Sequence, residues 1–432
     1  MRSQGGPTLA TVSWTRALVV AATVALCAAG LLALVARAPA SLRRYEPPPR
    51  ATDPERGTRF STREVARAAA YNGPRYLGVA LGAVVQCTLL VVLVRGPFAG
   101  LVRALAPLPG GWVARAVVAA IILAALSAAV ALPLAFVRWY AIDHAWGLST
   151  QGVGAWLLDR GRSLGVGAVV GAVGAVAFFA VARAQPRAWW LWGWLVFTVL
   201  QAVLVFLWPV AIAPLFNRFS PLPDGSLAAR ITSLGKAAGV RVEEVLVADA
   251  SRRTTTENAY VAGLGATKRV VVYDNLLEAG DEDETLYVVA HELGHEAESH
   301  VLKGVVLSSA GLLLGFAVLG WLARREAVLA AVDAAGIGDL GVLPALLLYA
   351  TLAGLLALPI ESAVSRSFER RADEIALELT GDRATAVRVL RRLALSNISD
   401  LDPPPAAVAF LYSHPPVRER IRAVLSPSPG AP

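Results

Sequence analysis

The sequence contains few charged residues: only 17% of its 432 residues are Asp, Glu, Lys or Arg, whereas 56% are hydrophobic. This composition excludes an ordinary soluble domain, in which about a quarter of the residues are charged. Cysteine is also scarce, and both Cys27 and Cys87 fall in apolar runs, where a free thiol acts as a small hydrophobic side chain. The sequence therefore offers neither a disulfide framework nor a cysteine-based zinc site.

The hydrophobic residues gather in long uncharged runs. Each run has the roughly 18 to 20 apolar residues that a helix needs to cross the hydrocarbon core of a bilayer. The runs are residues 17–36, 77–94, 116–137, 164–182, 188–216, 304–323 and 340–360. They predict a mainly helical, multi-pass cell-membrane protein with about seven transmembrane helices. The first run is also compatible with a secretory signal, because Ala36-Arg37-Ala38 resembles a small-x-small cleavage site.

The formal net charge of +8 can in principle indicate a nucleic-acid partner, but the placement of the arginines favours a membrane topology signal. Cytoplasmic loops carry an excess of Arg and Lys. By this rule the first loop, residues 138–163, residues 217–303 and the tail after residue 360 are expected on the cytoplasmic side. Nine arginines support this, at positions 37, 43, 44, 50, 56, 59, 63, 67 and 75. We expect the lipid bilayer and no nucleic acid as a partner.

The segments between the apolar runs are polar or rich in turn residues. Residues 40–75 read as a cytoplasmic arm with a short helix over 62–71, and the prolines of 95–115 predict a turn-rich connector. Residues 138–163 read as a loop in which His144 packs or lies at the membrane interface, with substrate contact as the alternative. The tail 426–432 is expected to be disordered.

One motif carries the chemistry: His291-Glu292-Leu293-Gly294-His295. Residues four apart share a face of a helix, so His291 and His295 can present two imidazole nitrogens to one metal, with Glu292 beside them. The chain has only five histidines, so a chance occurrence is rare. The pattern predicts a zinc hydrolase with one Zn²⁺ per chain; two solvated histidines on a surface helix are the alternative.

A catalytic zinc needs a third protein ligand and an open position. Glu369 and Asp373 are four apart on a predicted helix after the seventh run, so Glu369 can bind zinc while Asp373 accepts a hydrogen bond from a ligand histidine. Glu361 competes for the third position. A simple pairing of Glu369 with a nearby arginine on a solvated helix also remains open.

The remaining roles follow from the chemistry of peptide hydrolysis. Glu292 is the expected general base, which takes a proton from the attacking water and passes it to the leaving amine. His414, in a turn stiffened by two prolines, is a candidate donor to the oxyanion. His300 is expected to be solvated or to lie behind the ligands. Acidic residues 281–284 are expected to cap the motif helix.

Upstream of the motif the chain changes to a soluble pattern. We expect a helix over 227–238 and strands over 242–247 and 269–273. Between the strands, residues 257–265 can form either an ordinary hairpin or an edge strand that binds the substrate backbone by strand addition through Asn258, Ala259 and Tyr260. We expect residues 1–216 to form a membrane region with five helices and 304–360 a transmembrane hairpin, so that 217–303 and 361–425 together make a zincin-like α+β catalytic domain.

Taken together, several short motifs resemble the zinc metallopeptidases of the CAAX prenyl endopeptidase type, with the bacterial heat-shock protease HtpX as a more distant relative. They are Pro214-Leu215-Phe216-Asn217, Asn258-Ala259-Tyr260, the His-Glu-Leu-Gly-His motif, Ser365 to Asp373, and Ser413-His414-Pro415-Pro416. The Ala, Arg and Gly bias of the composition indicates a bacterial member.

The resemblance implies a gluzincin in which Glu369 is the third zinc ligand and Asp373 supports the site. It also implies that Asn258 and His414 bind substrate and the oxyanion, beneath a large intramembrane chamber. We therefore predict a membrane zinc endopeptidase that cleaves peptides or membrane-associated proteins. An HtpX-like quality-control protease and a catalytically inactive scaffold or transporter are the alternatives, and the oligomeric state stays open.

Overall fold

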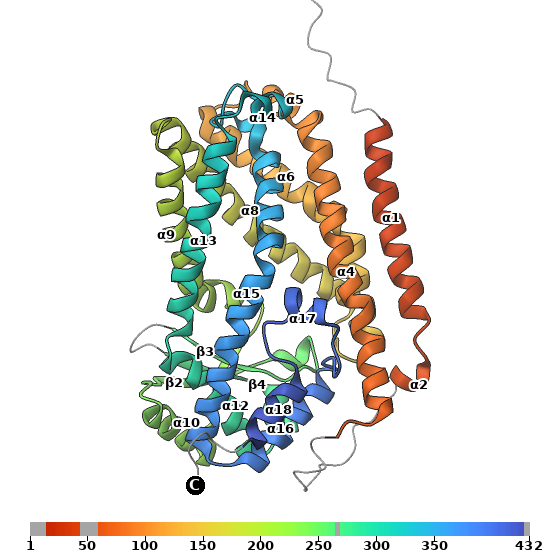
Figure 1. Ribbon diagram of the computed structural model, residues 1–432, viewed down its shortest axis with the longest axis vertical. Coiled ribbons are helices and arrows are strands. Elements are labelled where there is room, and N and C mark those ends of the chain that lie inside the picture. The colour runs from red at the N-terminus through yellow and green to blue at the C-terminus, as the bar shows by residue number, and fades with distance from the viewer. Residues whose placement is uncertain (1–13, 44–58, 264–267, 427–432) are drawn as a thin grey trace, which may run out of the picture.

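The computed structural model describes residues 14–43, 59–263 and 268–426. Long helices fill one half of the molecule, and a small sheet with short helices fills the other (Figure 1). The predicted tail 426–432, except Ser426, and residues 44–58 of the predicted arm lie outside the described residues. The two halves are joined without a break, because the longest helix runs through both.

Seven helices in the described part of the chain are long and apolar enough to cross a membrane, which confirms the predicted mainly helical, multi-pass architecture. They expose many large apolar side chains, as helices surrounded by lipid do. The helices are α1 (Trp14–Ala36), α4 (Thr62–Val94), α6 (Gly111–Phe136), α8 (Val153–Ala184), α9 (Trp189–Leu207), α13 (His300–Leu322) and α15 (Leu343–Thr380).

Several of these helices extend beyond their apolar runs. α4 begins at Thr62, so the second half of the predicted arm belongs to a transmembrane helix capped by Ser61 and Glu64. The predicted loop 138–163 is wrong: α6 continues through the π-helix η1 (Val137–Ala141) and α7 (Ile142–Ala145), and α8 starts at Val153. Polar side chains stay within helices here because they pair with one another, as Arg75 and Asp143 do.

Short helices occupy several connections. The predicted connector 95–115 contains α5 (Pro97–Ala104), which starts with a proline at its first position, where no N–H is needed. The other short membrane-side elements are α2 (Ala40–Arg43), η2 (Trp208–Ile212), η3 (Ala213–Leu215), α14 (Glu326–Ala331) and η6 (Leu340–Val342).

A four-stranded sheet forms the base of the second half, in the order β1-β2-β4-β3. β2 and β4 are parallel, and both outer strands pair antiparallel with their neighbours. The strands are β1 (Phe219–Pro221), β2 (Glu244–Ala248), β3 (Ala259–Ala262) and β4 (Arg269–Tyr273). β4 matches its prediction, β2 starts two residues late, and β3 takes the edge position considered for residues 257–265.

Helices pack against this sheet around one apolar core. Val270 and Val272 of β4 and Leu293 of the motif helix are fully buried in it. The helices of this half are α10 (Ser226–Ala237), α11 (Asp274–Ala279), α12 (Glu282–Ala297), α16 (Arg383–Ser396), α17 (Pro405–Leu411) and α18 (Val417–Leu425), with the single turn η4 (Ala250–Arg252). α10 confirms the helix expected over 227–238 within one residue at each end.

α15 connects the two halves. It runs unbroken from Leu343 to Thr380, with Pro359 in its interior. The expected division between residues 360 and 361 therefore falls within one continuous helix. Since Glu369 and Asp373 lie on the same helix as the last membrane span, the site described next is fixed to the membrane region by covalent and hydrogen-bonded structure.

Candidate metal centre

The motif helix α12 is well defined at its start. The Asp281 carboxylate accepts a hydrogen bond from the Glu284 backbone N–H, as expected for an N-terminal cap. Three further acidic residues occupy the first turn, where the helix dipole favours negative charge. The helix ends before Ser299, whose positive φ of 54° turns the chain sharply into α13. This places His291 and His295 in the last two turns, beneath the membrane helices.

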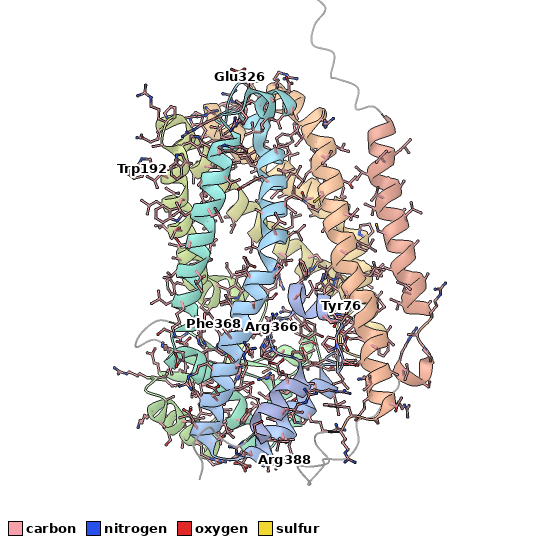
Figure 2. The ribbon with its side chains drawn as sticks, viewed as in Figure 1. Tyr76, Trp192, Glu326, Arg366, Phe368 and Arg388 are labelled. Carbon is pink, nitrogen blue, oxygen red and sulfur yellow. The ribbon has the colours of Figure 1, made fainter. Side chains whose placement is uncertain are left out.

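A close approach of two helices, α12 and α15, brings the Glu369 carboxylate to the two histidines. A Cβ atom on Gly294 would lie 3.2 Å from both Cα and O of Ala372 on α15. Because glycine has no side chain, α12 and α15 can pack almost backbone to backbone at this point. Glu369, one turn before Ala372, is thereby held directly over the motif. Figure 2 shows its neighbours Arg366 and Phe368 where α15 passes from the long helices to the sheet.

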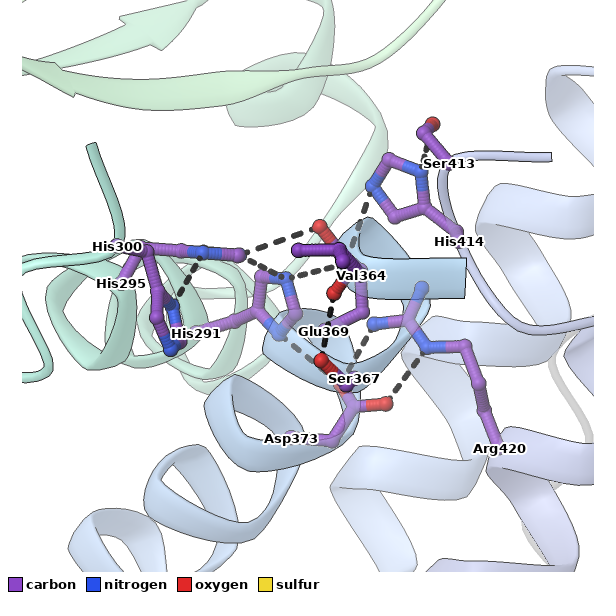
Figure 3. Close-up of polar contacts among 10 residues, drawn as sticks. All are labelled: His291, His295, His300, Val364, Ser367, Glu369, Asp373, Ser413, His414 and Arg420. Carbon is purple, nitrogen blue, oxygen red and sulfur yellow. Dashed lines mark hydrogen bonds and ion pairs between the residues drawn. The ribbon is translucent and has the colours of Figure 1, made fainter. Parts of the chain in front are cut away.

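Three side chains converge between the two helices. His291 Nε2 lies 3.1 Å from Glu369 Oε2, and His295 Nε2 lies 3.3 Å from Glu369 Oε1. The two Nε2 atoms are 3.3 Å apart (Figure 3). No other group of histidine, cysteine or acidic residues among those described gathers ligand atoms in this way. Glu361, the alternative third ligand, is not part of the group.

The other ring nitrogen of His291, Nδ1, contacts a carboxylate on the side away from the convergence point. This Nδ1 lies 2.9 Å from Asp373 Oδ1, and Arg420 of α18 donates two hydrogen bonds to the same carboxylate, at 2.6 and 2.8 Å. Burial lowers the pKa of the Arg420 guanidinium, but Asp373, together with Glu369 and Tyr287, raises it above its ordinary value overall, so this cation stays charged. An ionised Asp373 beside Nδ1 favours the tautomer of His291 that carries its proton on Nδ1, which leaves Nε2 with a lone pair for a metal.

The second histidine has an equivalent support. His295 Nδ1 lies 3.0 Å from His300 Nδ1. The ring of His300 is buried and stacks on Phe368, with centroids 4.3 Å apart. His300 is thus fixed behind His295 rather than solvated, which resolves the two roles considered for it. In both His291 and His295, Nε2 is the nitrogen that points to the convergence point.

His414 completes the ring of polar groups around Glu369. Its Nε2 lies 3.2 Å from Glu369 Oε2, and its Nδ1 lies 2.8 Å from Ser413 Oγ. The side chain is 55% exposed, so it faces open space rather than the core. Arg366 fixes the preceding segment by donating hydrogen bonds to the backbone oxygens of Val408 and Tyr412.

A cavity of about 1230 Å³ opens above these groups. His291, Glu292 and His414 line it at the base, and residues of α4, η1 and α7 line it on the membrane side. Burial raises the pKa of the Glu292 carboxyl above its ordinary value. A carboxyl group with a raised pKa is a stronger base when ionised, which suits proton abstraction from water.

The residue before the edge strand β3, Asn258, reaches the same cavity. Asn258 is exposed in the cavity wall, and its side-chain oxygen accepts a hydrogen bond from the Ala259 N–H. The Ala259 side chain points into the core, whereas Tyr260 is half-buried beside Tyr273. Ala259 can therefore meet a substrate only through its backbone. His144 stacks on Tyr140, in keeping with the expected packing role.

Two supporting residues were not predictable from the motif. Arg420 lies in Val417-Arg418-Glu419-Arg420, an ordinary amphipathic pattern, and nothing in its spacing indicates a partner far earlier in the chain. Phe368, next to Glu369, had only its position as a signal. Both act on side chains that were predicted, and neither lies at the convergence point.

Comparison with known proteins agrees with this architecture. The description "CAAX prenyl protease N-terminal, five membrane helices" matches residues 43–218, and "Peptidase family M48" matches residues 221–428. The crystal structure of S. mikatae Ste24p superposes with a TM-score of 0.73, covering 94% of this chain and 98% of the other at 24% identity. The fold is therefore that of a multi-pass membrane peptidase family.

Curated relatives extend the match to sequence. "Uncharacterized metalloprotease YhfN" of Bacillus subtilis is 34% identical, over 70% of this chain and 71% of its own. "CAAX prenyl protease 1" of Saccharomyces cerevisiae is 29% identical over 70% of each chain, and an Arabidopsis thaliana homologue of it is 32% identical over 68% and 69%. The fold and the relatives define an integral membrane metallopeptidase. The chain belongs to peptidase family M48.

Proposed function

We propose that this metallopeptidase is a zinc-dependent endopeptidase that hydrolyses peptides or membrane-associated proteins at the base of its cavity. The convergence of His291 Nε2, His295 Nε2 and a Glu369 carboxylate oxygen carries the proposal. Tetrahedral ligands at zinc bond lengths of about 2.0 to 2.1 Å lie about 3.3 Å from one another. The two Nε2 atoms are 3.3 Å apart, close to this separation, and each also lies 3.1 or 3.3 Å from one oxygen of the Glu369 carboxylate.

The donor set also fits a catalytic zinc. Three protein ligands leave one position open, and zinc at such a site acidifies water and polarises a carbonyl group. In the proposed assignment His291, His295 and Glu369 bind the metal, while Asp373 holds His291 in the correct tautomer. A thiolate is not needed, in agreement with the placement of both cysteines in membrane helices.

The residues around the metal position supply the acid–base chemistry. Glu292 takes a proton from the attacking water and delivers it to the leaving amine, and its raised pKa favours the first transfer. His414 donates a hydrogen bond to the developing oxyanion, for which its exposed ring in the cavity is well placed. Asn258, with the backbone of Ala259 and Tyr260, holds the substrate chain along the edge of β3.

The substrate class is proposed more broadly than the names of the eukaryotic relatives state. The names of the yeast and plant relatives contain the words "CAAX prenyl protease". The name of the Bacillus subtilis relative specifies a metalloprotease only. The cavity is large enough for several residues of a peptide and is lined by both membrane helices and the sheet domain. Such a cavity can admit both a free peptide and a segment of a membrane-associated protein.

We also propose that the sheet half faces the cytoplasm. The short helix α2 and the start of α4, which flank the Arg-rich first loop, lie at the same end of the molecule as α10, α16 and α18 (Figure 1). The positive-inside rule assigns that end to the cytoplasm. In this division residues 217–303 and 361–425 form the catalytic domain, and 304–360 is the hairpin between them.

The decisive experiment compares zinc content and peptide cleavage of the detergent-purified wild type and Glu292→Gln. We expect both to bind about one zinc per chain, and only the wild type to cleave a quenched fluorescent peptide. Glu296→Gln, on the same helix but paired with Lys268, is the matched control and is expected to cleave. Absence of zinc from the wild type, or equal cleavage by Glu292→Gln, contradicts the proposal.

A further inference from the structure

A second polar cluster lies on the membrane side of the cavity, away from the metal position. Arg75 Nη1 lies 2.5 Å from Asp143 Oδ1 and also donates a hydrogen bond to Tyr71 Oη. The Tyr71 hydroxyl donates to the same Asp143 oxygen. Arg138 lines the cavity beside this group. Two guanidinium groups therefore face one carboxylate.

The two arginines are arranged around one indole ring. The Arg138 guanidinium lies 4.3 Å from the centroid of Trp139, and that of Arg75 lies 4.9 Å from it. The stem of Arg138 packs against α4, because a Cβ on Gly78 would lie 3.1 Å from its Cδ. Stacking and packing fix the guanidinium before any ligand arrives, which reduces the entropy lost on binding.

Arg138 lacks the partner that Arg75 has. In the part of the chain that the structure describes, no carboxylate pairs with Arg138, and its buried Nε has no hydrogen-bond acceptor. Two other carboxylates of the cavity wall are engaged elsewhere: Asp400 accepts a hydrogen bond from Tyr76, and Glu257 pairs with Arg392. A cation placed on a membrane helix without a partner is costly and marks a functional position.

The backbone that carries Arg138 is itself unusual. Residues 137–141 form a π-helix between α6 and α7. Single π turns within membrane helices are rare and frequently occur at functional sites, since they change the direction of the side chains that follow. This observation is independent of the charge and points to the same residue.

The cluster is linked to the start of the edge strand. Asp143 accepts backbone hydrogen bonds from Leu148 and Ser149, and Ser149 pairs with Thr254 in a short antiparallel bridge. The chain continues from Thr254 directly towards Asn258 and β3. A peptide that pairs antiparallel with β3 has its carboxyl end at this side, because antiparallel partners run in opposite directions.

We infer that Arg138, assisted by Arg75, forms a subsite for the C-terminal carboxylate of a peptide lying in the cavity. The inference rests on the proposed peptidase function and adds to it a preference for substrates with a free carboxyl terminus. A guanidinium offers a planar pair of N–H donors that matches a carboxylate. The peptide carboxylate supplies the negative charge that the cluster lacks.

The test measures binding in Glu292→Gln protein, so that cleavage does not interfere. The probe is fluorescein-Gly-Ala-Ala-Leu-Phe-Val-Ile-Ala, prepared as the free acid and as the C-terminal amide, with fluorescence anisotropy as the readout. We expect the acid to bind about tenfold more tightly than the amide, as for one hydrogen-bonded charged pair. Adding Arg138→Gln is expected to abolish the difference, and Arg138→Lys to retain part of it.

Arg160→Gln is the matched control, because Arg160 also stacks on a tryptophan, Trp156, but does not line the cavity. It should keep the preference for the acid. Equal Kd values for acid and amide, binding of neither, or displacement of both forms alike by phosphatidylglycerol overturns the inference, the last in favour of a lipid site. A preference for the acid without any cleavage by the wild type supports the subsite and contradicts the proposed function.

Discussion

Arg420 and Asp373 form a two-pronged ion pair directly behind His291, with N–O distances of 2.6 and 2.8 Å. The pair joins α18, near the end of the chain, to α15, which descends from the membrane. Since Asp373 in turn contacts His291 Nδ1, the orientation of the His291 ring depends on Arg420, which lies outside the group of candidate ligands. Removal of Arg420 leaves Asp373 buried and without its main counter-charge.

We expect Arg420→Gln to weaken zinc binding by about 10- to 100-fold, because loss of an outer partner lets the ligand histidine reorient. Zinc affinity is measured by competition with a chelator. Arg370→Gln is the control, since Arg370 also joins α15 to α18, through Glu419, but both side chains of this pair are half-exposed. Equal zinc affinity in the two variants would show that the buried pair has no influence on the metal.

The close packing at Gly294 gives a second prediction. Gly294→Ala places a methyl group within 3.2 Å of the α15 backbone, so the helices must separate at the position where their ligands meet. We expect weaker zinc binding and a lower Tm, with a loss of about 1 to 3 kcal/mol of stability as is typical of overpacking. Calorimetry or thermal-shift measurement with and without zinc separates the two effects.

The matching substitution is Gly304→Ala on α13. A Cβ atom at Gly304 meets no other group within 4 Å, so this variant should be as stable as the wild type or slightly more so. If Gly294→Ala binds zinc as well as Gly304→Ala does, the close approach of α12 and α15 is not what positions Glu369.

Glu298, just after the motif helix, gives a pH prediction. Hydrogen bonds from Lys303 and Arg371 lower the pKa of its carboxyl from 4.5 to about 2. A lowered pKa means that the folded state favours the ionised form. The stabilisation is therefore fully present above about pH 4.5 and is lost as the pH falls towards 2.

We expect the difference in Tm between wild type and Glu298→Gln to shrink as the pH is lowered from 6 to 3, because over this range the carboxyl becomes protonated in the unfolded state while the folded state keeps it ionised. Glu278→Gln, at an exposed site on α11, should show a small difference that does not change in the same way. A Tm gap for Glu298→Gln that is constant or grows on acidification contradicts this assignment.

The proposed orientation is testable by labelling. In a background with Cys27 and Cys87 replaced by serine, Asp224→Cys and Glu326→Cys place single exposed thiols near the sheet and on α14, at opposite ends of the molecule (Figure 1). A membrane-impermeant maleimide should label Glu326→Cys in intact cells and Asp224→Cys only after permeabilisation. The reverse pattern would place the metal centre outside the cytoplasm.

The sequence was most informative where one local pattern determines structure. Apolar runs predicted the seven spans because crossing a bilayer requires a continuous apolar helix, and the four-residue spacing of His291 and His295 predicted a shared face. The third member of the site, Glu369, was proposed with Glu361 as a competitor. The structure brings Glu369 to the histidines because Gly294 admits α15 at that height.

Sequence patterns gave wrong or incomplete predictions where a charged residue pairs with a residue that is distant in the sequence. Arg138 and Asp143 made residues 138–163 look like a loop, yet these side chains line a polar cavity and the helix continues through them. The role of Arg420 depends on a contact with Asp373 across 47 positions, which no local spacing reveals. Short apolar helices such as α5 were hidden by the prolines that begin them.

Because α15 is continuous, a change in the tilt of its membrane-spanning part is transmitted to Glu369. A helix of 38 residues is a stiff rod, and its most compliant point is Pro359, between the membrane half and Glu369. A bilayer that is too thin or too thick changes the tilt of such a rod. Lipid chain length is thus a variable that acts on the position of Glu369, which has no counterpart in a water-soluble peptidase.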